Sequence, residues 1–230
     1  MTVDDTGRRS NLATVTGIAG LTGVVLLFGP IIAVSTQGEP PFDGSRDQVA
    51  TFFGNVAAVG WYQTAGALEA IGMLALLWYF VGLTTLLRRI EGPPAWRSTV
   101  ALLSGTLLVA YGNLDVSWDA AVNRGNETDP GVAPYAFDVG NIGFSNAWLS
   151  MASFALASGW ILLDSRALPR WWGWLGIAGG AGLVVARFAW ESPFWMIPYA
   201  LFWGWVIALA VRLVRRRHLV PDTVMEATQE

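Results

Sequence analysis

The sequence predicts an all-α protein, a polytopic bundle of six transmembrane helices. Two features of its composition predict this fold class: hydrophobic residues make up 53% of the 230 residues, and only 13% are charged. Soluble domains carry about 25% charged residues. The third observation is a set of six apolar stretches, each long enough to cross a bilayer, since a spanning helix needs about 20 residues. These stretches are residues 13–35, 60–87, 98–119, 143–163, 171–190 and 194–214.

The first stretch resembles a secretory signal peptide in two respects. Arg8 and Arg9 precede it, and Ala33-Val34-Ser35 resembles a cleavage site. Its apolar core is longer than the roughly 7–15 residues of a signal peptide. We therefore expect a retained helix. The expected domains are a cytoplasmic N-terminus at residues 1–12, a membrane domain at 13–217 and a cytoplasmic tail at 218–230.

A short amphipathic helix is predicted at residues 45–59, between the first two spans. Ser45 and Gln48 have the spacing of a capping box. Apolar residues then recur at i, i+3, i+4 and i+7, which is typical of one buried helical face; they are Val49, Phe52, Phe53 and Val56. This helix is expected outside the cytoplasm. Two positions for it stay open, on the outer membrane surface or packed on the ends of the spans.

Arginine placement predicts the orientation of the helices. Cytoplasmic loops of membrane proteins are rich in Lys and Arg. One set of loops and termini carries Arg8, Arg9, Arg88, Arg89, Arg97, Arg166, Arg170, Arg212, Arg215, Arg216 and Arg217, whereas the opposite loops carry only Arg46 and Arg124. Both termini are therefore expected in the cytoplasm. A chain with no Cys and no Lys is also typical of a high-GC bacterium, so we expect a multi-pass protein of the bacterial plasma membrane.

Glycines predict close contacts between helices. Gly17, Gly20 and Gly23 line the first span, and Gly176 and Gly180 form a small-xxx-small pattern in the fifth. Small residues let helix backbones approach closely in membranes.

The missing residue types exclude several kinds of chemistry. Without Lys there is no Schiff base, and without Cys there are no disulfides or iron–sulfur clusters. The one histidine, His218, follows the last apolar stretch, so histidine zinc sites lack ligands. We expect no cofactor, no metal and no nucleic-acid partner.

Ionisable residues within the spans are the main functional signal, since charges at membrane depth are costly and tend to be functional. Glu69 is expected about 13 Å below the outer start of the second span. In the third span Ser104, Tyr111, Asp115 and Asp119 share one helical face. All the ionisable groups fall in the outer half of the membrane. The candidate ligand-binding residues are Glu69, Tyr111, Asp115, Trp118, Asp119, Asn146, Arg187, Glu191 and Tyr199.

These residues predict an outward-facing cavity lined by Glu69, Asp115, Asp119 and Arg187. Trp195, Tyr199 and either Phe202 or Trp203 would add an aromatic wall. In the alternative interpretation these residues are structural: Arg187 neutralises one carboxylate and thereby links two helices.

One segment resembles a known family. The run Leu-Pro-Arg-Trp-Trp-Gly-Trp-Leu-Gly at residues 168–176 is similar to the LPRWLGWLG signature of a six-helix bacterial membrane family known only as a domain of unknown function. The resemblance covers residues 14–217. It implies the six-helix layout and no activity.

Two classes of function remain open. The first is binding of a membrane lipid or a lipophilic small molecule, or a role as a subunit of a homodimer or larger membrane complex. The second is an intramembrane enzyme of the terpene-cyclase kind, in which Glu69, Asp115 or Asp119 would be the catalytic acid and aromatic faces would stabilise a carbocation from an isoprenoid.

Overall fold

The computed structural model describes residues 3–112, 116–124 and 131–216, and this part of the chain forms helices and no strand. The helices are α1 (Val3–Ser35), α2 (Arg46–Ala58), α3 (Tyr62–Glu91), α4 (Trp96–Gly112), α5 (Val116–Arg124), α6 (Val132–Ser165), α7 (Arg170–Phe188), the 3-10 helix η1 (Pro193–Trp195) and α8 (Met196–Arg216). The all-helical fold class is confirmed for these residues. The predicted third span, residues 98–119, corresponds to two elements, α4 and α5.

Five helical stretches are long and apolar enough to cross a membrane: Asn11–Ser35, Tyr62–Glu91, Trp96–Asn123, Val132–Ser165 and Pro193–Arg215. The protein is therefore a multi-pass membrane protein by the length and composition of its helices. The remaining predicted span, residues 171–190, corresponds to α7. Its 19 residues include five glycines, three tryptophans and two arginines, which make it less apolar than the other five.

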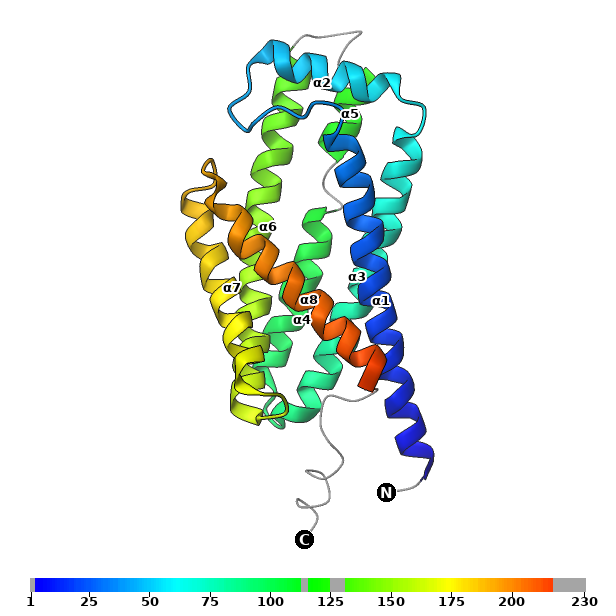
Figure 1. Ribbon diagram of the computed structural model, residues 1–230, viewed down its shortest axis with the longest axis vertical. Helices are drawn as coiled ribbons and strands as arrows, with labels where there is room; N and C mark the ends of the chain where they lie inside the picture. Colours follow the sequence, from blue (N-terminus) through cyan, green and yellow to red (C-terminus); the bar gives the residue numbers. More distant parts are fainter. Residues whose placement is uncertain (1–2, 113–115, 125–130, 217–230) are drawn as a thin grey trace.

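The long helices stand side by side, and α2 lies across one end of the bundle (Figure 1). We call this the α2 end. Helix α1 packs along α3, and α6 contacts both α4 and α7. Helix α8 crosses the bundle obliquely and contacts α1 and α7 (Figure 1). Helices α1, α3 and α6 extend further toward α2 than α7 does, so the α2 end rises above the α7–α8 connection.

Glycines bring α6 and α7 into close contact, as their spacing predicts. A Cβ atom added to Gly180 would lie 2.9 Å from the carbonyl oxygen of Ala152, and one added to Gly176 would lie 3.1 Å from that of Ala155. Contacts this short leave no room for a larger side chain. On α1, Gly20 lies against Tyr79 of α3 and Ala210 of α8 in the same way.

Helix α2 forms as predicted. The backbone N–H of Ser45 donates to Gln48 Oε1 at 2.8 Å, and the backbone N–H of Gln48 donates to Ser45 Oγ at 3.4 Å, which completes the capping box. The four predicted apolar side chains are buried. They pack against α5 and α6. Of the two positions considered, packing on the ends of the long helices is therefore the one observed.

Candidate functional site

The predicted site residues fall into three separate groups. The first is the cap cluster beneath α2, formed by Phe52, Phe53, Trp118 and Phe137. The Trp118 ring lies 5.5 Å from Phe52 and stacks on Phe137 at 5.9 Å. Next to it, the Tyr62 hydroxyl donates to Asp119 at 2.8 Å. Trp118 and Asp119 therefore hold α2, α3, α5 and α6 together at the α2 end.

The second group is a pair, Arg187 and Asn146. The Arg187 Nε–H donates to Asn146 Oδ1 at 3.0 Å, which joins α7 to α6. We expected Arg187 to pair with an acid. In the described part of the chain, no carboxylate lies within ion-pair distance of its guanidinium. A neutral amide thus accepts one hydrogen bond from this guanidinium. Glu69, Asp119 and Glu191 do not gather around it.

The third group is the aromatic cluster, formed by Phe28 of α1, Phe144 and Trp148 of α6, Trp195 of η1, and Tyr199 and Trp203 of α8. Neighbouring ring centroids lie 5.2 to 6.2 Å apart, mostly in edge-to-face contacts. Trp148 and Trp203 are buried, and the other rings are half-buried. The predicted aromatic wall is therefore present, with Trp203 in it, while Phe202 packs on Phe154 of α6.

Glu69 lies on α3 and is half-buried. Of the predicted site residues, Tyr199 belongs to the aromatic cluster.

Two buried donor groups lie on the inner face of α6. The indole N–H of Trp148 and the side-chain amide of Asn141 have no hydrogen-bond partner among the described residues, and both side chains are buried, with exposed fractions of 0% and 4%. They are seven residues apart, so they lie on one side of the helix. Buried polar groups nearly always have a partner. The Thr16 hydroxyl and the Trp118 indole N–H, elsewhere in the described chain, likewise have no partner among the described residues.

The length of α3 bears on the depth of Glu69 in a membrane. A span that begins at residue 60 would place Glu69 near the middle of the membrane. Helix α3 has 30 residues, which makes it about 45 Å long, more than the roughly 30 Å of the hydrocarbon core. Measured from Arg88 at its other end, Glu69 lies about 28 Å along the helix.

The remaining predicted residues, Tyr111, Glu191 and Asp115, are not among the members of these three groups. Tyr111 is half-buried at the end of α4 and packs against the main core. Glu191 is exposed in the turn between α7 and η1. Asp115 lies outside the described residues.

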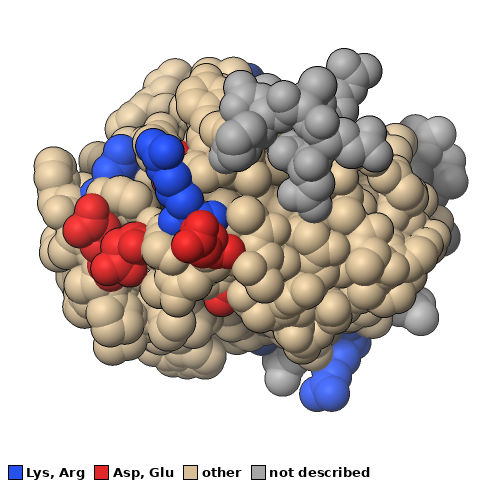
Figure 2. Space-filling model, turned by 90° about the horizontal axis from the view of Figure 1, so that it is seen from above, with Lys and Arg blue, Asp and Glu red and all other residues tan. Residues whose placement is uncertain are grey.

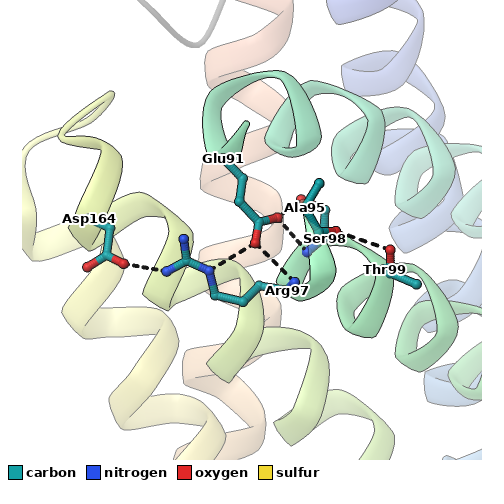
Figure 3. A network of polar contacts seen from close by, with 6 residues as sticks. All are labelled: Glu91, Ala95, Arg97, Ser98, Thr99 and Asp164. Carbon is teal, nitrogen blue, oxygen red and sulfur yellow. Dashed lines mark hydrogen bonds and ion pairs between the residues drawn. The ribbon is translucent and has the colours of Figure 1, made fainter. Parts of the chain in front are cut away.

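A polar network at the end opposite α2 was not predicted (Figure 3). Glu91 at the end of α3 accepts hydrogen bonds from the backbone N–H groups of Arg97 and Ser98, at 3.0 and 2.9 Å, and from Arg97 Nε at 3.0 Å. Arg97 also pairs with Asp164 of α6 and lies over the Trp160 ring, 5.1 Å from its centroid. Glu91 thus caps the start of α4, and the network has a structural role. An acid just before a proline turn and a new helix was the available signal.

A shallow open groove of about 440 Å³ runs along the start of α8 and is lined by Met196, Ile197, Ala200 and Leu201. All four side chains are exposed. Tyr199 follows Met196 by three positions, so it lies on the edge of the same surface. The groove therefore borders the aromatic cluster.

Acidic and basic side chains lie next to one another on one side of the molecule when it is viewed from the α2 end (Figure 2). The exposed acids of this part of the chain are Glu39, Asp43, Asp47, Asp119, Asp138 and Glu191.

Among the residues that the structure places, no group of His, Cys, Asp and Glu is arranged to hold a metal ion.

Comparison with known proteins identifies one family. Residues 15–216 match the family described as Domain of unknown function (DUF4386). Curated proteins and solved structures give no match.

Proposed function

Because the chain belongs to the DUF4386 family, whose description names no activity, we propose a function from its own geometry. It is a six-span protein of the bacterial plasma membrane that binds a lipophilic or amphipathic small molecule at its outer face. The site consists of Glu69, Tyr199 and the aromatic cluster.

The proposed sixth span is α7. It packs against α6 along its length and contacts α8, and its neighbours on both sides in the chain are apolar enough to span. Six spans place both termini on one side. The arginines at the ends of α3, α4, α6, α7 and α8 support a cytoplasmic position for that side; they are Arg88, Arg89, Arg97, Arg166, Arg170, Arg212 and Arg215. The α2 end then lies outside the cytoplasm.

This orientation places Glu69 near the outer boundary of the hydrocarbon core, about one core thickness above Arg88. The α7–α8 connection lies at a similar level, and α2 with α5 forms a cap above it (Figure 1). The site then opens to the outer leaflet and the aqueous phase together. A ligand with one polar and one apolar part fits such a boundary.

One observation carries the proposal: the half-buried rings of the aromatic cluster lie beside two buried donors without partners in the described chain. Ligand sites combine aromatic and apolar walls with a few polar groups.

The first prediction concerns Glu69 and Tyr199. The full-length protein is reconstituted in lipid nanodiscs, and alkyl amphiphiles with cationic, anionic and neutral headgroups are tested for thermal stabilisation. A ligand present at 100 times its Kd stabilises a protein by about 2.7 kcal/mol. We expect at least one headgroup class to stabilise the wild type. Glu69→Gln and Tyr199→Phe should each weaken that response at least tenfold while the melting temperature without ligand is retained.

The matched control is Asp138→Asn, which removes an exposed carboxylate at the α2 end and should leave the response unchanged. The proposal is wrong if no amphiphile stabilises the wild type. It is also wrong if all four proteins respond alike.

A further inference from the structure

We infer that Arg187 and Asn146 bind the phosphate group of an anionic phospholipid in the outer leaflet. This site is separate from the aromatic cluster, and the inference rests on the six-span topology of the proposed function. It is carried by the charge of Arg187, by the N–H groups that the pair leaves open, by the level of the pair in the membrane and by the apolar surface around it.

Arg187 places a positive charge in the last turn of α7. Its Nε–H donates to Asn146 Oδ1 at 3.0 Å, and an amide oxygen does not neutralise a cation. Among residues 3–112, 116–124 and 131–216, no carboxylate forms an ion pair with it. A guanidinium stays charged at physiological pH, and a charge at membrane depth is costly without a partner. An anion from outside the chain would neutralise it.

The other N–H groups of this pair are the proposed phosphate donors. In the part of the chain that the structure describes, Arg187 Nη1 and Nη2 and Asn146 Nδ2 have no hydrogen-bond partner, and the protein does not enclose them. Both side chains are half-buried, and their mutual hydrogen bond holds the guanidinium against α6. A guanidinium presents parallel N–H groups that match two oxygens of one phosphate. The pair is therefore a partly ordered donor set for that group.

The pair lies at the level of the outer headgroups. Helix α7 begins at Arg170, and Arg187 is the eighteenth of its 19 residues, so the two arginines are about 26 Å apart along the helix. The hydrocarbon core is about 30 Å thick. With Arg170 at the cytoplasmic boundary, Arg187 lies just inside the outer boundary, and a long arginine side chain extends toward the headgroups.

Exposed apolar side chains surround the pair. Ile142 precedes Asn146 by four residues and Leu149 follows it by three, so the three share one face of α6. Both apolar side chains are exposed, as is Phe188 next to Arg187 on α7. Exposed apolar residues of a spanning helix contact lipid. An acyl chain that descends from a phosphate at Arg187 would therefore pass Leu149, which lies about 4.5 Å deeper than Asn146.

This face of α6 differs from the one that carries the aromatic cluster. Asn146 is two residues from both Phe144 and Trp148, which corresponds to about 160° of rotation around the helix. Changes at Arg187 and Asn146 therefore leave the rings of the cluster in place. The lipid site and the proposed function can fail independently of each other.

The test measures the melting temperature of the full-length protein in neutral maltoside micelles. Three probes are titrated at matched ionic strength: dioleoyl phosphatidylglycerol, dioleoylglycerol, which lacks the phosphate, and inorganic phosphate, which lacks the chains. We expect saturable stabilisation by phosphatidylglycerol. Its half-maximal concentration should be at least tenfold below that of either other probe, because only this lipid combines the phosphate with the chains.

Two variants locate the effect. Arg187→Gln removes the charge and should raise the half-maximal concentration at least tenfold. Asn146→Asp places a carboxylate beside the guanidinium, so it should cause the same loss of lipid response while the melting temperature without lipid is kept or raised. The matched control is Arg46→Gln, which removes an exposed arginine at the α2 end and should respond like the wild type. If Arg187→Gln does not fold, Asn146→Asp decides.

Three results would contradict the lipid site. Equal stabilisation by dioleoylglycerol would mean that no phosphate is recognised. Equal stabilisation by inorganic phosphate would indicate a site for the free ion. An unchanged phosphatidylglycerol response in Asn146→Asp would place the lipid elsewhere. None of these results touches binding at the aromatic cluster, which depends on the response of Glu69→Gln and Tyr199→Phe.

Discussion

The carboxylate of Glu91 is nearly inaccessible, with a side-chain exposure of 3%, and Arg97 beside it is 15% exposed. Its oxygens accept hydrogen bonds from the first backbone N–H groups of α4. Those groups have no partner within the helix, so an acceptor at that position stabilises the helix start. The same carboxylate neutralises Arg97. One residue therefore fixes the turn between α3 and α4.

Glu91→Gln tests this role. The amide keeps the volume but loses the charge that pairs with Arg97, so we expect a loss of about 1–3 kcal/mol in the free energy of unfolding. Asp164→Asn is the matched control. Asp164 pairs with the same arginine but has a side-chain exposure of 56%, and exposed ion pairs contribute about 0–1 kcal/mol. Equal losses in the two variants, measured by denaturation in detergent micelles, would contradict the account.

Arg187 shows what the sequence leaves undetermined at the level of single residues. The cost of its charge in a membrane predicted an acid as its partner, and the partner found is the amide of Asn146. The choice between Asn146 and an acid depends on how α6 and α7 are rotated and aligned, over a separation of 41 residues. A shift of one residue rotates a side chain by about 100° around the helix. The sequence pattern does not determine a rotation of that size.

Helices with strong local signals were predicted well. Helix α2 depends on its capping box and on four apolar residues at helical spacing, and these signals lie within about fifteen residues of one another. What α2 contacts depends on the lengths of α3 and α6, which extend beyond a bilayer thickness and provide a platform for it. Composition identifies apolar stretches well and does not show how far a helix continues past them.

Close packing of α6 and α7 allows a prediction for the pair of helices. Gly180→Val would place a side chain against the carbonyl oxygen of Ala152, where even a Cβ atom lies at 2.9 Å. We expect a loss of about 1–3 kcal/mol from overpacking. The control is Gly204→Ala on α8, because no atom lies within 4 Å of a Cβ added there. That variant should be as stable as the wild type or slightly more stable. A tolerated Gly180→Val would show that α6 and α7 are not in close contact.

The whole molecule combines a bundle of bilayer length with a cap of α2 and α5 on one end. The core clusters are separate: one fills the bundle, and a second lies beneath α2. The aromatic cluster lies at the upper edge of the first core. The prediction of a single cavity lined by Glu69, Asp115, Asp119 and Arg187 joined residues that the structure keeps apart, since Asp119 lies at the cap cluster and Arg187 binds Asn146. Helical faces alone do not show which helices are neighbours.

The position of the α7–α8 connection determines whether this cluster can face outward. A protein with five spans would place it differently from one with six. The chain contains no cysteine, so a single introduced cysteine reports its own accessibility without background. Ala189 in the α7–α8 connection and Arg166 between α6 and α7 are both exposed, and they lie at opposite ends of α7.

The most direct test is therefore labelling of Ala189→Cys and Arg166→Cys in intact bacterial cells with a maleimide that does not cross membranes. Six spans with an outward site predict that Cys at position 189 is labelled in intact cells, and that Cys at position 166 is labelled only after lysis. Labelling of both or neither in intact cells, or the reverse pattern, would contradict the six-span topology and with it an outward-facing site.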